Sequence, residues 1–192
     1  MPPLLKAFGP ALLALTLVSC KTPPDRQQFP EITFQHLQPF RLDVARVEIV
    51  DGYQPDPAND IGSQFPESPQ AVARQWGEDR LLAVGQQGEA IYTITLAKAT
   101  QTSLRRSTGM SAVTNKDQSD RYDLQISVNL EIRSGGKSGA VAAKAARSQT
   151  VREDMTLNQR EAVLFRLLDV TMKDVNAQME KVIPHYLGGF VP

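Results

Sequence analysis

Residues 121–133 read RYDLQISVNLEIR and carry the clearest pattern in the chain. Apolar side chains occupy every second position, and polar or charged residues stand between them. The apolar set is Tyr122, Leu124, Ile126, Val128, Leu130 and Ile132. Successive side chains of a strand point to opposite faces, so the segment predicts a strand with one buried and one solvated face. Strands of this kind are typical of antiparallel sheets.

The segments on either side predict the neighbours of this strand. Residues 89–100 place Ala90, Tyr92, Ile94 and Leu96 at a period of two. They predict a strand, which a polar loop at 101–119 separates from the first. The glycine-rich run at 134–139 predicts a turn, and 140–151 predict the returning strand of a hairpin. The alanines of 140–151 also suit a helix, and we favour the strand because the turn is short.

A helix is predicted to begin at Ser68 and Pro69. Serine caps the free amides of a first turn, and proline has no N–H to leave unsatisfied at the first helical position. Gly85 suits a left-handed helix end. Between these limits, one helix face carries Ala73, Trp76, Gly77, Leu81 and Val84. Trp76 could stack on a ligand, but its helical spacing favours a place in the core.

A second, longer helix is predicted after residue 155. Thr156 and Gln159 form a capping box, and Pro184 marks a fraying end. An apolar stripe follows at alternating spacings of three and four: Phe165, Leu168, Met172, Val175, Met179, Val182 and Tyr186. The stripe suits a helix that covers a sheet, and a coiled coil remains the alternative.

Residues 40–50, FRLDVARVEIV, predict the remaining strand, although its apolar phase shifts between Leu42/Val44 and Val47/Ile49. A bulge or burial on both faces would reconcile the two phases. Residues 51–67 predict a long loop. The order is strand, helix, three strands, helix. We therefore expect one α+β domain over 40–192, a two-layer sandwich whose four-stranded, mostly antiparallel sheet carries two helices on one face.

The N-terminus has the layout of a secretory signal. One cation, Lys6, precedes an apolar run at 7–18 that is too short to span a bilayer, which needs about 20 apolar residues. Residues 17–20 read LVSC and resemble the lipobox of bacterial lipoprotein precursors. The resemblance implies that a signal peptide, 1–19, is removed and that Cys20 carries a diacylglycerol and an amide-linked acyl chain such as palmitate. An ordinary secretory signal containing a cysteine is the alternative.

Residues 20–39 predict a tether between this lipid and the domain, because the segment is rich in proline and has no sustained periodicity. Its apolar residues leave open that it docks on the domain: Phe29, Ile32, Phe34 and Leu37.

Most catalytic chemistry has no visible place in the sequence. Cys20 is the only cysteine, and the two histidines, His36 and His185, have no further ligands at metal-binding spacing. No phosphate-binding glycine loop or nucleophile elbow is present. With 21 basic and 21 acidic residues, the chain has no field that would attract nucleic acid. We expect no enzyme activity, no cofactor, no metal and no nucleic-acid partner.

One basic cluster lies around the predicted loop at 101–119. It comprises Arg105, Arg106, Lys116 and Arg121. Guanidinium groups pair bidentately with phosphate, so the cluster could contact an anionic lipid head group. A solvated loop is the alternative.

With its lipobox and its order of strands and helices, the chain resembles small Gram-negative envelope lipoproteins, among them the LPS-assembly (LptE-like) and ABC-transport auxiliary lipoproteins. The resemblance implies a periplasmic accessory protein that binds a protein partner in envelope assembly or lipid transport. A lipid- or glycan-binding module is the alternative, and a hydrolase is a third reading. Lys21 follows the lipidated cysteine, where aspartate would favour inner-membrane retention, so we expect the outer membrane.

Overall fold

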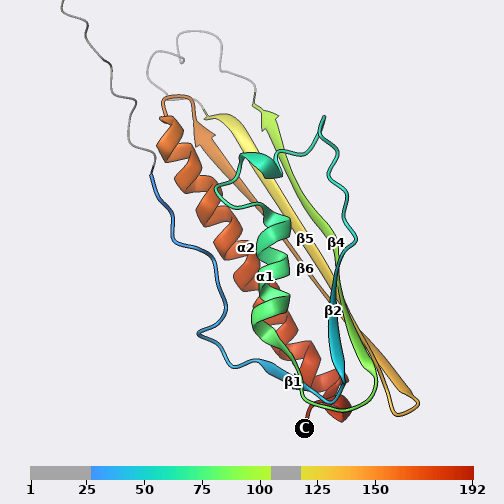
Figure 1. The fold of residues 1–192 in the computed structure, drawn as a ribbon. Helices are drawn as coiled ribbons and strands as arrows, with labels where there is room; N and C mark the ends of the chain where they lie inside the picture. Colours follow the sequence, from blue (N-terminus) through green and yellow to red (C-terminus); the bar gives the residue numbers. More distant parts are fainter. Residues whose placement is uncertain (1–26, 105–117) are drawn as a thin grey trace, which may run out of the picture.

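The computed structural model describes residues 27–104 and 118–192. Two helices cover one face of a four-stranded sheet of order β2-β4-β5-β6, as Figure 1 shows. Neighbouring strands are antiparallel except the pair β2–β4. This arrangement confirms the predicted α+β two-layer sandwich. The elements are β1 (Phe40–Leu42), β2 (Arg46–Asp51), a 3-10 turn (Gly62–Gln64), α1 (Pro69–Arg80), β3 (Leu81–Ala83), β4 (Glu89–Ser103), β5 (Gln118–Ser134), β6 (Lys137–Arg152), α2 (Leu157–Tyr186) and a last 3-10 turn (Gly188–Phe190).

The hairpin β5–β6 forms as predicted. All six apolar residues of 121–133 are buried, and 140–151 form a strand rather than a helix. The connection is shorter than predicted, because Ser134 already pairs with Lys137. Only Gly135 and Gly136 remain in the turn, with φ of 58° and 76°. Two-residue hairpin turns that follow the sheet twist need positive φ at both positions, which glycine adopts without strain.

A bulge in β4 corrects the predicted core of that strand. The register with β5 shifts between Ile94 and Leu96, so Thr95 is the extra residue. An extra residue moves every later side chain to the other face. Leu96 is therefore only half-buried, whereas Ala97 and Ala99 point into the core.

Residues 40–50 form two strands instead of the one predicted. β1 pairs in parallel with β3, and β2 pairs in parallel with β4 in the main sheet. The shift in apolar phase therefore marks a crossing between two sheets and not a bulge. Leu42 and Val44 are fully buried at this crossing. Asp43, between them, donates its N–H to the carbonyl of Phe190, 2.8 Å away, and so ties the crossing to the C-terminus.

The helix predicted from Ser68 starts as expected but ends earlier. Ser68 Oγ accepts the N–H of Ala71 at 3.1 Å, and Pro69 is the first helical residue. The helix ends at Arg80, because Leu81 is extended and pairs with Phe40. Gly85 is therefore not a left-handed helix end. Its Cβ would lie 2.6 Å from the carbonyl carbon of Asp43, so glycine is needed where two backbones meet.

The second helix, α2, has the predicted capping box. Thr156 Oγ1 accepts the N–H of Gln159 at 3.3 Å, and Gln159 Oε1 accepts that of Thr156 at 2.9 Å. The stripe faces the sheet along most of its length, but Tyr186 is 68% exposed and Ile183 is buried in its place. Across the described ranges, neither helix is both long and apolar enough to span a bilayer.

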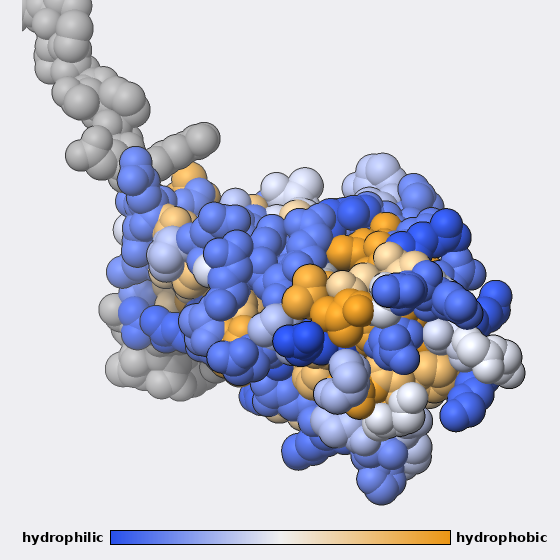
Figure 2. All heavy atoms as spheres, turned by 60° about the horizontal axis from the view of Figure 1, so that its bottom comes forward, coloured by the Kyte–Doolittle hydropathy of each residue, from blue (hydrophilic) through white to orange (hydrophobic). Residues whose placement is uncertain are grey.

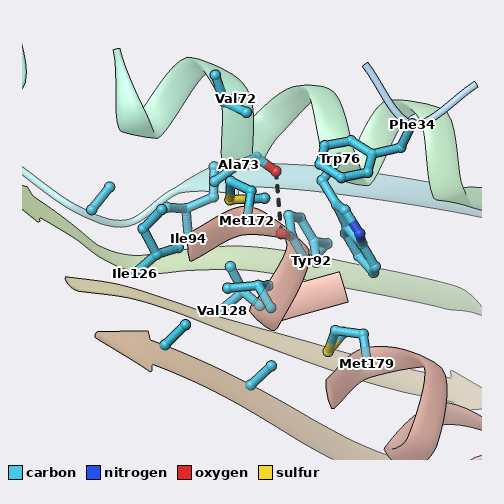
Figure 3. Close-up of a cluster of buried hydrophobic side chains, with 14 of the residues drawn as sticks. Phe34, Val72, Ala73, Trp76, Tyr92, Ile94, Ile126, Val128, Met172 and Met179 are labelled. Carbon is cyan, nitrogen blue, oxygen red and sulfur yellow. Dashed lines mark hydrogen bonds between the residues drawn. The ribbon is translucent and has the colours of Figure 1, made fainter. Parts of the chain in front are cut away.

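Figure 3 shows a cluster of buried side chains in which α1, α2 and the sheet meet. Tyr92 donates its hydroxyl to the carbonyl of Ala73 at 3.2 Å, and the rings of Tyr92 and Trp76 lie 5.3 Å apart. Trp76 is fully buried and donates its indole N–H to Asn176 Oδ1 at 2.9 Å. The prediction that Trp76 is a core residue is therefore confirmed.

Candidate partner-binding surfaces

The predicted lipid and phosphate sites lie mostly outside the described residues. Cys20, Arg105, Arg106 and Lys116 belong to the parts of the chain that the structure does not describe. Arg121 is described: it lies on β5 and donates from Nε to Asp123 Oδ2 at 2.9 Å. Its charge is therefore already paired, and the basic cluster as a whole stays a prediction.

The two histidines do not converge. His36 is exposed before β1, and His185 is exposed in the last turn of α2, where its ring meets Tyr186 edge-on. Within residues 27–104 and 118–192, no three His, Cys, Asp or Glu side chains stand close enough to hold a metal ion.

Residues 27–39, named here the N-terminal strap, pack against the domain. Ile32 and Phe34 are 7% and 5% exposed, and Phe34 lies beside Trp76 in Figure 3. Phe29 stacks on Phe165 of α2 with ring centroids 5.0 Å apart. The sequence left open whether this segment docks on the domain, and residues 27–39 do dock on it. Figure 1 shows the strap running beside α2 toward β1.

Asp79 of α1 holds the strap by hydrogen bonds. Its Oδ2 accepts the N–H of Phe34 at 2.7 Å and the hydroxyl of Thr33 at 2.8 Å, while Oδ1 accepts from Gln75. Partial burial raises the pKa of the Asp79 carboxyl, but the hydrogen bonds outweigh it, and the net pKa is lowered. The carboxylate is thus the form that the strap binds.

Arg80 holds the C-terminal part of the strap, at Gln38. Its side chain is 3% exposed and donates to the carbonyl of Gln38 and, at 2.9 Å, to Glu180 of α2. The guanidinium also lies 4.8 Å over the ring of Phe40. Burial lowers the pKa of Arg80, and Glu180 opposes that shift. In the sequence, Asp79 and Arg80 look like solvated helix residues, and no local pattern connects them with residues 42 to 46 positions earlier.

The loop at 52–67 borders a half-open cavity of about 300 Å³. Asp60 organises the loop: Oδ2 accepts the hydroxyl of Tyr53 at 2.5 Å, and Oδ1 accepts the N–H of Gly62 at 2.7 Å. Burial raises the pKa of Tyr53, and the bond to Asp60 adds to the shift. The cavity walls are mainly apolar and include Tyr53, Pro55, Pro57, Pro69 and Ala97. The cavity has the size and apolarity of a small ligand site.

Apolar side chains are exposed at the end of the domain where the C-terminus lies. Leu82 and Val84 are 46% and 38% exposed, and we name this pair the end patch. Figure 2 views this end and shows apolar atoms gathered among polar ones. The strap begins at the other end of the molecule, near the start of α2 (Figure 1). Exposed apolar side chains that gather on one surface can mark a contact site.

Comparisons with known proteins give no family. No family model matches the sequence, and no curated protein matches it. Among solved structures, a minor lipoprotein from Acinetobacter baumannii is 13% identical, with 75% of this chain and 93% of that chain covered and a TM-score of 0.36. Rare lipoprotein B from Shewanella oneidensis is 8% identical, with 71% and 98% covered and a TM-score of 0.32. The PelC dodecamer from Paraburkholderia phytofirmans is 14% identical, with 71% and 91% covered and a TM-score of 0.27. Similarities at this level identify neither family nor function.

Proposed function

We propose that the protein is a bacterial envelope lipoprotein, held in the membrane by acyl chains on Cys20. Its periplasmic domain acts without catalysis, as an accessory that binds a protein partner in envelope assembly or lipid transport. The observation that carries the proposal is the arrangement of the two ends. The LVSC motif lies a few residues before the strap, and the exposed end patch lies at the opposite end of the domain.

The lengths favour a protein partner for the end patch. The 30 residues of α2 extend about 45 Å. The seven residue steps from Cys20 to Gln27 reach at most about 25 Å. We propose that the domain stands upright on this anchor, so that the end patch faces away from the membrane that holds Cys20.

The anchor is tested by Cys20→Ser. Stable attachment needs more than one acyl chain, and the variant has no thiol to receive the diacylglycerol. We expect the variant in the soluble periplasmic fraction with its signal peptide uncleaved by the lipoprotein peptidase. A variant that stays with the membrane like the wild type would refute the anchor. Density gradients decide the membrane: we propose the outer one because Lys21 follows Cys20.

The partner is tested by cross-linking in cells. Leu82→Asp places a charge in the end patch, and Leu157→Asp places one at a leucine that is 69% exposed at the start of α2. A partner bound through the end patch should cross-link to the wild type and to Leu157→Asp but not to Leu82→Asp. Equal cross-linking of both variants would exclude the end patch.

A second function, a lipid- or glycan-binding module, is favoured by the cavity beside Tyr53. Protein extracted in mild detergent should then carry a lipid or sugar that mass spectrometry detects. Tyr53→Ala removes one wall of the cavity and should release that ligand while leaving the cross-linked partner in place.

A further inference from the structure

Strand β6 is an edge strand of the sheet, and its outer edge forms hydrogen bonds with the side-chain amide of Gln178. Lys144 donates its backbone N–H to Gln178 Oε1 at 3.2 Å, and Gln178 Nε2 donates to the carbonyl of Lys144 at 2.9 Å. The side-chain amide of α2 thus takes the place that a peptide group of another strand would occupy. Exposed edges are templates for such pairing, and this protein closes its edge at Lys144.

These two bonds determine which backbone groups of β6 face outward. In an antiparallel pair, the N–H and C=O of alternate residues point toward the neighbouring strand and away from it. The backbone N–H and C=O of Lys144 point away from β5. The pairing with β5 continues in register through Val151, so the backbone groups of Ala142, Ser148 and Thr150 also point away from β5. The carbonyl of Thr150 accepts from Gln149 Nε2 at 3.0 Å, as an outward-facing group would.

Beside Ser148 and Thr150, the edge is bordered by a cavity of about 410 Å³, named here the β6–α2 groove. Its apolar lining consists of Met155, Val163, Leu167 and Val170. An outward-facing strand edge beside an apolar groove under a helix is the arrangement that accepts an extended peptide by strand addition. The main-chain bonds then supply affinity, and the groove selects the side chains.

The charge of the groove is positive. Arg147 and Arg166 line it, and Arg147 is paired with Asp174 through two bonds of 2.6 and 3.0 Å. Arg166 is exposed, and in the described part of the chain no carboxylate forms an ion pair with it. Arg166 is therefore the cation that remains for a ligand.

The N-terminal strap does not fill the groove. The strap lies against the side of α2 that carries Phe165 and Asn176. Val163 and Val170 project from the opposite side of the helix at 3.6 residues per turn. The β6–α2 groove is thus separate from the strap, and also from the end patch.

We propose that the β6–α2 groove binds an extended peptide segment of a partner protein, which pairs with Ser148 and Thr150 as an added strand. An apolar side chain of the segment enters the groove, and an acidic residue pairs with Arg166. The proposal deepens the proposed function and rests on it in one respect, that the partner is a protein.

The test uses the full mature lipoprotein in detergent micelles and a fluorescein-labelled peptide, TVTIDVT, followed by anisotropy. We expect binding by the wild type. Thr150→Pro removes an outward N–H without removing a bond to β5, and should weaken binding about tenfold or more. Ala142→Pro makes the same change outside the groove and should bind like the wild type. Circular dichroism checks that both variants fold.

The charge is tested by a swap. Arg166→Glu should weaken the peptide about tenfold, and a peptide with lysine in place of aspartate should recover the loss. No binding by the wild type up to about 1 mM peptide would refute the proposal, as would equal binding by both proline variants.

Displacement of the peptide by anionic phospholipid vesicles would assign the groove to a lipid, and dimerisation through β6 in light scattering would assign it to a second copy. None of these results affects the tests of Cys20 or the end patch, so the two proposals fail separately.

Discussion

Strand β5 of the β5–β6 hairpin and the segment 40–51 both carry alternating apolar and polar residues, yet they pair differently. In the hairpin, two glycines connect the strands and one register continues for most of their length. In the segment 40–51, three residues pair with β3 and six with β4, and the chain turns between them. The hairpin has its partner next to it in sequence, whereas both partners of 40–51 come after α1.

The difference shows which patterns can be interpreted locally. A hairpin closes a short loop, so its alternation and its turn residues are sufficient to predict it. A parallel pair needs a crossover, and its partner and register depend on helix packing farther along the chain. The same alternation therefore predicts a strand in both regions but a correct pairing in only one.

The largest effect is expected in the hairpin. Ile126 is fully buried and Gln125 is exposed. Ile126→Asp buries an unpaired charge, which costs several kcal/mol, on the order of the 5–15 kcal/mol that holds a whole domain. Gln125→Asp should change the free energy of unfolding by less than about 0.5 kcal/mol. Urea unfolding followed by circular dichroism measures both, and equal effects would mean that the strand does not alternate as described.

The crossing between β1 and β2 should be next in sensitivity. In Gly85→Ala, the new Cβ would meet the backbone of Asp43 and Val44 at 2.6–2.7 Å. Because backbone cannot move aside as a side chain can, we expect a loss of about 1–3 kcal/mol. Gly188→Ala is the control, since its Cβ would meet no atom within 4 Å. Thermal unfolding measures the difference, and a Gly85→Ala variant as stable as the control would contradict the close approach.

The strap should respond to Asp79→Asn and to pH. The variant loses charge-assisted hydrogen bonds to Phe34 and Thr33, worth about 2 kcal/mol together. Because the folded pKa of Asp79 is lowered, its contribution is complete above the unfolded pKa and is lost as the pH falls through the folded one. The protection factor of the Phe34 amide, which corrects for the slower intrinsic exchange in acid, should therefore fall at acidic pH in the wild type.

The control for the strap is Glu78→Gln, which changes an exposed carboxylate one residue away. Its exchange at Phe34 should follow the wild type at every pH. In Asp79→Asn, the protection factor of the Phe34 amide should be low at every pH and should show no acid transition, because asparagine has no proton to titrate. The same pH profile in wild type and Asp79→Asn would show that another group holds the strap.

The smallest effects are expected at the hairpin turn. Gly136→Ala introduces a Cβ at φ 76°, which costs about 1 kcal/mol although no atom lies within 4 Å. Gly135→Asn should be nearly neutral, because asparagine is favoured at positive φ in this turn. Melting temperatures distinguish them, and an equally large loss for both would argue against a two-residue turn.

The candidate binding surfaces also divide into features set by local sequence and features set by long-range contacts. The LVSC motif is a local pattern, and the sequence by itself is enough to predict an anchor at Cys20. The contacts of Asp79 and Arg80 with the strap join residues 45 and 42 apart, and the pairing of Lys144 with Gln178 joins residues 34 apart. Each of these polar residues looks solvated in the sequence, because its partner is set only when helix and sheet have packed.

The sequence alone determined the hairpin, the helix starts and the two-layer class, because caps, turns and side-chain periodicity act over a few residues. The tertiary structure decided where α1 ends, how 40–51 is divided and where the bulge shifts β4. At Arg80 the pairing of Leu81 with Phe40 overrides helix continuation, and at Gly85 the approach of two backbones overrides local preference. These outcomes depend on long-range contacts, whose free energy no window of the sequence contains.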